Sequence, residues 1–420
     1  MMLKQQAWIV FWLKLKREYR FVQSRVQHVS AAVLETGEFM MNRFNFGVLV
    51  LVASLAVATL PALAVPPGEP LFEVTRLEIG YGPGCSGDIV ELKDGTLLFV
   101  MHTGLEFWKE GIMARISKDR GRTWSKGFSM VAPATGGRKK QSANWAHPSL
   151  LRLPNGEILL SYIVVTQTSY WNASPRVSDG EGLSYSAHNY WRRSADEGKT
   201  WTDQYIMTPQ PGYNLMHNGK LLVLSTGRII SPVSYKKRDL IIPVADHGGY
   251  VSTCFYSDDN GYSWHRSKND IDMLGVGVEV SEPHVVELKD GRLMMMFRNY
   301  SGFVGRSYSD DGGETWSPGE LVKELPMPHC TPLTVDRIPS NGDLLLTMPT
   351  GPGGRTPLVS LISQDEGKTW THRRAILDEP DARYGYQVVK FLDDVVLVAT
   401  STRQNPIVVR LSVDWFYQGD

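Results

Sequence analysis

The chain has 420 residues, of which 42% are hydrophobic and 21% are charged. Lys and Arg together number 44, as do Asp and Glu, so no net charge favours nucleic acid or an anionic membrane surface as a partner. A chain of this length is too long for one ordinary domain, unless that domain is built of repeats. Cys85, Cys254 and Cys330 lie far apart and make no metal-binding or redox spacing. We therefore expect free thiols, no bound metal and no other cofactor.

The N-terminal region resembles an export signal. An apolar run over 44–63 follows a basic residue and ends in a small-x-small pattern at Ala64. These features are typical of a secretory signal peptide, so we predict one over 40–64, cleaved after Ala64. Because the signal begins at Met40, we interpret residues 1–39 as an upstream extension, or as a tail if the run is a signal anchor. We expect a secreted or periplasmic protein without stable membrane insertion.

One short motif recurs through the rest of the chain. The pattern Ser-x-Asp-x-Gly-x-(Ser/Thr)-Trp occurs five times, at 117–124, 194–201, 257–264, 309–316 and 363–370. Asp and Gly at these offsets favour a hairpin turn, because the Asp side chain caps the turn and Gly accepts a positive φ. The Trp supplies an apolar anchor for the strand that follows. The recurrence indicates a structural repeat.

A second pattern, two apolar runs around a turn pair, predicts β-hairpins. It occurs at 91–100, 152–162, 223–233, 287–297, 338–348 and 391–400. Five of these hairpins are followed by the Asp motif, and the sixth by a degenerate copy at 411–415. Six units of about four strands each predict an all-β fold, a six-bladed β-propeller over 65–420. The segment 71–79 is expected to close the ring against the last blade, because an open edge strand is a liability.

The repeated motif resembles the Asp box, or BNR repeat, of the sialidase (neuraminidase) superfamily, and the resemblance spans about residues 71–415. In that family the boxes lie at the blade periphery. The resemblance therefore implies structural roles for the five box acids, Asp119, Asp196, Asp259, Asp311 and Asp365. Asp boxes also occur in propellers with other functions, so the resemblance is more specific for fold than for activity.

Candidate site residues are sought where the innermost strands of a propeller begin, around its central axis. The positions just before the six hairpins are Cys85 to Asp88, His147, His217, Glu282 and His284, His329, and Tyr384 and Tyr386. Titratable groups and Tyr are enriched there, which favours a functional site at this end of the propeller.

The resemblance assigns roles to four of the residues in the last three blades. Retaining sialidases use a Tyr nucleophile, a Glu that takes its proton, a carboxylic acid as proton donor and three arginines that hold the substrate carboxylate. By position, Tyr386 rather than Tyr384 matches the nucleophile and Glu282 matches the base. Arg298 and Arg355 match two carboxylate-binding arginines. Arginine suits this task because its planar group makes two-pronged contacts.

Two parts of the family pattern are missing from the first blade. The first arginine is replaced by Cys85-Ser86-Gly87, and Arg228 or Arg152 could take its place. The loop 102–111 lacks the usual Asp and offers only Glu106 and Glu110 as proton donors. A Glu could serve if burial raised its pKa.

The first reading is an exo-α-sialidase-type glycoside hydrolase that acts on a glycan or glycoconjugate with a terminal acidic sugar. The axial histidines His147, His217 and His329 favour a second reading, a propeller hydrolase or lyase on acidic polysaccharide that uses His and Tyr386. A third reading is a non-catalytic glycan-binding propeller. The long segment 166–190, with Tyr170, Trp171 and Tyr185, is expected to form a wall of the binding site in each case.

Overall fold

The computed structural model describes most of the chain after Pro70. The described residues are 71–77, 87–102, 111–131, 143–166, 186–210, 214–216, 221–237, 249–328, 330–351, 354–393, 395–402 and 406–419. The predicted signal peptide and the extension before it lie outside them. Within these ranges, no helix is long and apolar enough to cross a membrane.

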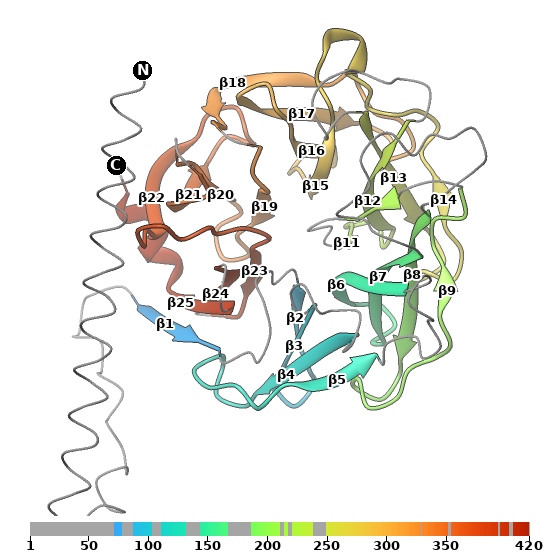
Figure 1. Cartoon of the computed structure of the whole chain (residues 1–420), viewed down its shortest axis with the longest axis vertical. Helices are drawn as coiled ribbons and strands as arrows, with labels where there is room; N and C mark the ends of the chain where they lie inside the picture. Colours follow the sequence, from blue (N-terminus) through green and yellow to red (C-terminus); the bar gives the residue numbers. More distant parts are fainter. Residues whose placement is uncertain are drawn as a thin grey trace, which may run out of the picture. The chain divides into compact units, whose positions relative to one another are not determined.

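Six antiparallel sheets follow one another around a ring, which confirms the predicted six-bladed β-propeller (Figure 1). Blade one contains β2 (Gly87–Glu91), β3 (Leu97–His102), β4 (Ile112–Ser117) and β5 (Phe128–Val131). Blade two contains β6 (Ala143–Arg152), β7 (Ile158–Thr166), β8 (Ser186–Ser194) and β9 (Tyr205–Ile206). Blade three contains β10 (Asn214–Leu215), β11 (Leu222–Val223), β12 (Ile229–Lys236), β13 (Tyr250–Ser257) and β14 (His265–Arg266).

The second half of the ring repeats the same order of strands. Blade four contains β15 (Ser281–Glu287), β16 (Leu293–Arg298), β17 (Phe303–Ser309) and β18 (Glu320–Pro326). Blade five contains β19 (Thr334–Arg337), β20 (Leu344–Pro349), β21 (Leu358–Ser363) and β22 (Thr371–Leu377). Blade six contains β23 (Val388–Phe391), β24 (Val396–Ser401), β25 (Pro406–Leu411) and β1 (Phe72–Arg76). Two short 3₁₀ helices, η1 (Leu274–Val276) and η2 (Val413–Gln418), complete the described elements.

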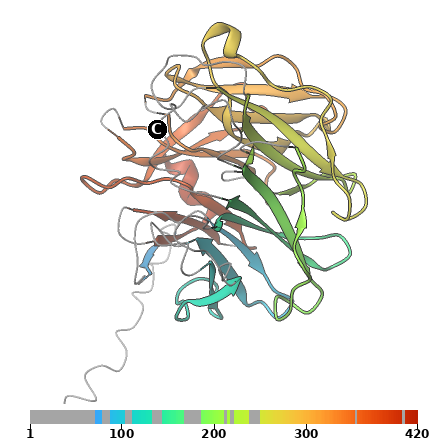
Figure 2. The same ribbon diagram turned by 45° about the vertical axis from the view of Figure 1, so that its right-hand side comes forward.

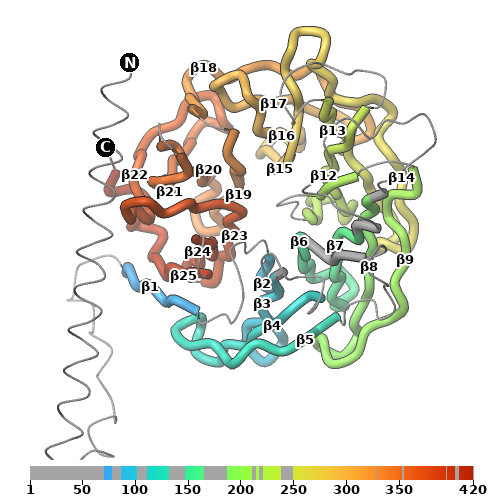
Figure 3. Tube along the Cα trace, in the orientation of Figure 1, coloured from blue at the N-terminus to red at the C-terminus, as the bar shows by residue number. Residues whose placement is uncertain are grey.

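The innermost strands determine which residues reach the middle of the ring. The chain trace places β2, β6, β15, β19 and β23 nearest its centre (Figure 3). In blade three, β10 and β11 share the innermost position, because both pair with β12. The sheets are visibly twisted in the rotated view, as antiparallel sheets ordinarily are (Figure 2).

The cores lie between neighbouring blades. The central strand β16 is covered on both faces, which explains why its sequence is apolar without alternation: Leu293–Phe297 are all buried. One cluster joins blades four and five through Val286, Met296 and Leu346. Full burial of such side chains contributes about 1.5–3 kcal/mol each. The packing between blades therefore holds the inner strand starts in fixed positions.

The ring is closed by the first described strand. β1 pairs antiparallel with β25, from Phe72 opposite Leu411 to Arg76 opposite Ile407. The predicted closure by the segment 71–79 is thus confirmed over its described part. Pairing β1 with the last blade removes the edge that β25 would otherwise expose.

The Asp boxes are turn structures whose carboxylates are fully engaged. In the fourth box, Asp311 accepts hydrogen bonds from the Ser309 hydroxyl at 2.9 Å and from the Thr315 hydroxyl at 2.6 Å. The Ser309 hydroxyl in turn accepts the Gly313 N–H at 2.9 Å. In the second box the Thr200 hydroxyl holds the pKa of Asp196 down, to about 2. These acids are occupied in local hydrogen bonds, as the resemblance implied.

Candidate active site

Three residues at the inner strand starts share an uncommon backbone conformation. His147 has φ 51°, Glu282 has φ 45° and Tyr386 has φ 53°. Each stands six positions before the leucine that begins its hairpin turn, Leu153, Leu288 or Leu392. A positive φ is costly for residues other than glycine and is often found at functional sites, where the surrounding structure holds it in place. The same register position in blades two, four and six is therefore built in the same strained way.

Strand irregularities accompany two of these residues. The pairing of β15 with β16 shifts between Ser281 and His284, on either side of Glu282. The pairing of β6 with β7 shifts in the same way between Ala146 and Ser149, on either side of His147. A β-bulge redirects the side chain that it carries. The bulges explain how the side chains of Glu282 and His147 reach Tyr386 on blade six.

Glu282 links two other groups at the centre of the ring. The Tyr386 hydroxyl donates to Glu282 Oε1 over 3.4 Å, and Arg298 Nη1 donates to Glu282 Oε2 over 2.5 Å. The Glu282 side chain is 3% exposed and that of Arg298 is 13% exposed. Burial opposes the charge of Arg298, but the Glu282 carboxylate beside it raises the pKa of Arg298 well above its usual range. The pair is a largely buried, charged hydrogen bond that orients Glu282.

Two further side chains surround the Tyr386 ring. The guanidinium carbon of Arg355 lies 5.4 Å from the ring centroid, and the His147 ring centroid lies 5.5 Å from it. Gly385 makes room for the arginine, because a Cβ there would come within 2.8 Å of Arg355 Nη1. The main chain also joins these segments, since the Tyr384 N–H donates to the Arg355 carbonyl over 3.0 Å. The structure thus brings together Glu282, Arg298, Arg355, His147 and Tyr386.

Tyr384, the alternative to Tyr386 in the sequence, has a different place. It is fully buried, and its hydroxyl accepts the Glu379 N–H over 3.0 Å. Burial raises the pKa of the Tyr384 hydroxyl. Its position suits a support for the loop that precedes Tyr386.

Glu279 is a neighbour of this group that the sequence reasoning missed. It lies between Val278 and Val280 and is 8% exposed. Burial raises the pKa of Glu279 to about 7, although the charge of Arg298 pulls it in the opposite direction. An acid flanked by valines, three residues before Glu282, was the available signal.

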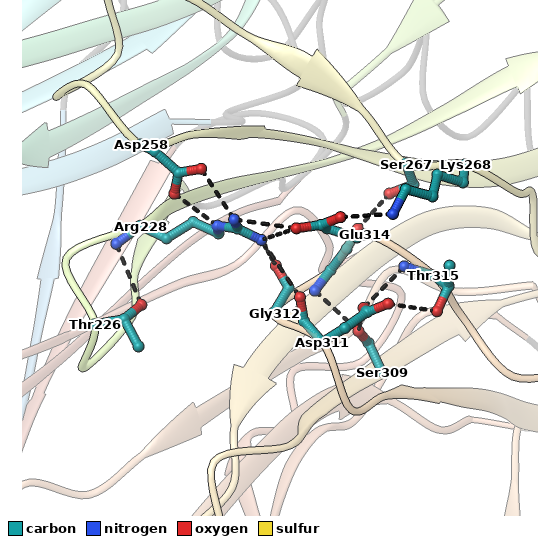
Figure 4. Close-up of polar contacts among 11 residues, drawn as sticks. Thr226, Arg228, Asp258, Ser267, Lys268, Ser309, Asp311, Gly312, Glu314 and Thr315 are labelled. Carbon is teal, nitrogen blue, oxygen red and sulfur yellow. Dashed lines mark hydrogen bonds and ion pairs between the residues drawn. The ribbon is translucent and has the colours of Figure 1, made fainter.

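Arg228 and Arg152 do not join the group, which corrects the expectation that one of them replaces the missing arginine. Arg228 donates to Asp258 of its own blade over 2.7 Å (Figure 4). It also donates over 3.1 Å to the Gly312 carbonyl, which lies in the Asp box of the next blade. Arg152 donates to Glu197 over 2.6 Å at the junction of blades one and two. Both guanidinium groups are occupied by contacts that fasten neighbouring blades.

Two other polar residues from the strand starts also connect blades. Asp88 accepts the Ser149 hydroxyl at 2.9 Å and the Leu150 N–H at 3.0 Å. His284 Nδ1 accepts the Val335 N–H at 3.3 Å. Both side chains are buried, so they hold one blade to the next.

Several predicted residues lie outside the described part of the chain. They are the proton-donor candidates Glu106 and Glu110, the histidines His217 and His329, and the loop aromatics Tyr170, Trp171 and Tyr185. Cys254 and Cys330 are free thiols. Among the described residues, no cluster of three or more His, Cys, Asp or Glu side chains could hold a metal ion.

Comparisons with known proteins bear on the family and the fold of the chain. Residues 111–394 match the BNR repeat-like domain family. A sialidase of Micromonospora viridifaciens is 26% identical over 358 residues, which cover 76% of this chain and 50% of the relative. A sialidase of Bacteroides fragilis is 23% identical over 295 residues, covering 66% of this chain and 51% of the relative. The chain thus spans about half the length of these two relatives.

Solved structures with the same fold include several sialidases. The Hadza microbial sialidase Hz136 superposes with a TM-score of 0.63 at 18% identity, covering 79% of this chain and 66% of the other. The intramolecular trans-sialidase of Ruminococcus gnavus superposes with a TM-score of 0.60 at 16% identity, covering 80% and 95%. The chain therefore belongs to the BNR repeat-like domain family and, through it, to the sialidase superfamily.

Proposed function

We propose that this protein is a retaining glycoside hydrolase of the exo-α-sialidase type. It releases a terminal sialic acid or a related 2-keto-3-deoxy acid sugar from a glycan or glycoconjugate. The observation that carries the proposal is the chain of contacts from the Tyr386 hydroxyl through Glu282 to Arg298. The sialidase relatives support the same class of activity.

The proposed nucleophile suits a substrate whose anomeric carbon bears a carboxylate. An ionised Asp or Glu nucleophile would be repelled by that group, whereas a neutral Tyr is not. A Tyr needs a neighbouring base, and Glu282 Oε1 faces the Tyr386 hydroxyl. Arg298 holds the other carboxylate oxygen, Oε2, so that Oε1 remains directed at the tyrosine.

In the first step the Tyr386 oxygen bonds to the anomeric carbon while its proton passes to Glu282. The glycosidic C–O bond breaks, and Glu110 or Glu106 gives the leaving oxygen a proton. In the second step, water loses a proton to that same acid and attacks the anomeric carbon. The tyrosyl bond breaks, and Glu282 returns its proton to Tyr386. Arg298 and Arg355 would hold the substrate carboxylate throughout.

The test is hydrolysis of a fluorogenic α-sialoside by the full-length protein and by Tyr386→Phe. The substitution keeps the ring but removes the attacking oxygen, so turnover should fall by several orders of magnitude, on the scale expected for loss of a nucleophile. Tyr262→Phe is the matched control, because Tyr262 is 61% exposed in the Asp box at 257–264. Wild-type turnover by Tyr386→Phe would remove the proposal.

The contact between His147 and Tyr386 favours a second candidate, a His/Tyr lyase or hydrolase acting on acidic polysaccharide. A panel of uronate polysaccharides separates the two, because lyase action creates an unsaturated uronate that absorbs near the ultraviolet edge. His147→Asn suits this assay, since Asn tolerates the positive φ at this position. The lyase candidate predicts loss of the absorbance change in that variant. The sialidase candidate predicts no absorbance change with either protein.

We propose further that the protein is exported, with residues 40–64 removed as a signal peptide. The support is the sequence pattern alone. Sequencing the N-terminus of the mature protein tests it. Export predicts Val65 as the first residue, and an intact Met1 would contradict it.

A further inference from the structure

Glu279 and Arg298 each have one buried polar atom that makes no hydrogen bond to a described residue, an acceptor on Glu279 and a donor on Arg298. Glu279 Oε2 and Arg298 Nε are both buried, and neither has a hydrogen-bond partner among the described residues. The other oxygen of Glu279, Oε1, accepts a long hydrogen bond from the Ser281 hydroxyl at 3.4 Å. Ser281 is also the residue paired with Arg298 across the sheet, and its hydroxyl lies 3.5 Å from the Arg298 carbonyl. Ser281 thus links the acid to the arginine strand.

The backbone keeps Glu279 in this position. The Val280 N–H donates to the Tyr250 carbonyl over 2.9 Å. The Ser252 hydroxyl donates to the Val280 carbonyl over 2.9 Å, and the Val280 side chain is fully buried. These contacts fix the backbone next to Glu279, and the Ser281 hydroxyl places the Glu279 carboxylate at the Arg298 end of the strand pair.

The charged and titratable groups that act on Glu279 come from several elements: Arg298 at the end of β16, Glu282 in β15, Lys236 at the end of β12, and Tyr300 and Cys330 in loops. Burial raises the pKa of Cys330 to about 11 and also raises the pKa of Tyr300. Neither group therefore changes charge near neutral pH. Burial raises the pKa of Glu279 to about 7, so Glu279 itself does.

We propose that Glu279 is a positioning residue whose protonation controls how strongly Arg298 holds an anionic ligand. The inference rests on the proposed role of Arg298 in binding a substrate carboxylate. When Glu279 is neutral, Arg298 faces one carboxylate, Glu282, and can accept the substrate carboxylate as a second. When Glu279 is ionised, Arg298 already faces two negative charges, and a third is disfavoured.

The coupling has a size and a sign that can be measured. At an effective dielectric of about 20, one unit charge roughly 12 Å from a bound anion changes the affinity for that anion about tenfold. The affinity for an anionic sugar should therefore fall about tenfold as Glu279 ionises around pH 7. By linkage, binding should take up about half a proton near pH 7.5, because the bound anion favours the neutral form of Glu279.

The experiment is isothermal titration calorimetry of the full-length protein with 2-deoxy-2,3-didehydro-N-acetylneuraminic acid. Titrations in buffers of different ionisation enthalpy at pH 7.5 give the number of protons taken up. Glu279→Gln should bind with little proton uptake and with nearly the same affinity at pH 6 and pH 8. Glu324→Gln is the matched control, since it makes the same charge change at an exposed position of β18 in the same blade.

A second variant tests the direction of the effect. The Ser281 hydroxyl lowers the pKa of Glu279, so Ser281→Ala should move the fall in affinity to higher pH. The methyl ester of the ligand, which lacks the negative charge, should show no fall. Equal proton uptake by wild type and Glu279→Gln overturns the inference while leaving the proposed function intact. Failure of the wild type to bind the acid at any pH contradicts the proposed function itself.

Discussion

Tyr386 of blade six and Glu282 of blade four meet across the ring, with the tyrosine hydroxyl 3.4 Å from Glu282 Oε1. They are far apart in the sequence, and each sits at a strained strand start with positive φ. The curvature of the consecutive blades four to six brings the two residues together. The geometry of the proposed catalytic pair therefore depends on the integrity of the propeller.

Removing the charge of Glu282 should affect both turnover and stability. In Glu282→Gln, Tyr386 loses its proposed base, so we expect kcat to fall about 10²- to 10⁴-fold. The change also leaves Arg298 as a buried charge without its partner, at a cost of about 3–5 kcal/mol in the free energy of unfolding. Sialoside kinetics and chemical denaturation measure the two effects.

The double variant Glu282→Gln with Arg298→Met separates these effects. It removes both charges, so much of the stability should return while activity stays low. Stability of the single variant equal to that of the wild type would show that the pair is not buried as described.

Gly385→Ala should weaken substrate binding. A Cβ at this position would come within 2.8 Å of Arg355 Nη1, so the arginine must move away from Tyr386. We expect KM for an acidic sugar substrate to rise about tenfold, the effect of losing one good charged hydrogen bond. Gly354→Ala is the control, because nothing lies within 4 Å of a Cβ there, next to the same arginine. The same rise in both variants would argue against a role for Arg355.

Arg228→Ala should lower stability without changing activity. Arg228 pairs with Asp258 of its own blade and joins blade three to the Asp box of blade four through Glu314 and the Gly312 carbonyl, and its side chain is 17% exposed (Figure 4). Because the partner Asp258 is more than half exposed, we expect a loss of about 1–2 kcal/mol and a fall in Tm of a few degrees. The exposed Arg292→Ala serves as control and should change Tm little. Loss of turnover in Arg228→Ala, at a temperature where the variant is folded, would show that Arg228 takes part in the site and contradict its purely structural role.

Glu279 should lower the stability of the protein as pH rises from about 4.5 to about 7. Its pKa is about 7 in the folded protein against an ordinary value of 4.5. The unfolded chain therefore loses this proton first, and the stabilising contribution is lost between about pH 4.5 and pH 7. The loss is at most on the order of 3 kcal/mol.

Denaturation of wild type and Glu279→Gln from pH 4 to pH 9 measures this contribution. The two proteins should differ in the slope of stability against pH over that window and run parallel above it. Parallel curves throughout would show that Glu279 does not titrate as stated. The Asp boxes affect stability at low pH instead. The pKa of Asp196 is lowered to about 2, so its contribution to stability is lost as pH falls below about 4.

The fold was predictable because its signal is repeated. Five Asp boxes and six hairpins each mark one blade, so an error at one copy does not change the result. Closure of the ring by β1 was predicted for a separate reason, because an open edge strand on the last blade would be a liability. Blade three departs from the pattern, because its inner position is divided between β10 and β11. No turn pattern in the sequence predicted this division.

The site was harder to read because its contacts join blades rather than neighbours in the chain. Resemblance to a family selected Tyr386, Glu282, Arg298 and Arg355, which the structure brings together. The place of Arg228 could not be read in this way, because an arginine after a hairpin turn looks the same whether it faces the axis or the next Asp box. Glu279 was missed because burial and the approach of Arg298, which set its properties, appear only in three dimensions.

The most direct test of the account is to trap the covalent intermediate on Tyr386. The full-length protein is incubated with a fluorinated sialic acid carrying a good leaving group, which slows the second step, and is then examined by peptide mass spectrometry. The account predicts one added glycosyl unit on the peptide that contains Tyr386, and none in Tyr386→Phe. Sialoside turnover by a protein that carries the adduct on another residue, or that carries the same adduct in Tyr386→Phe, would contradict it.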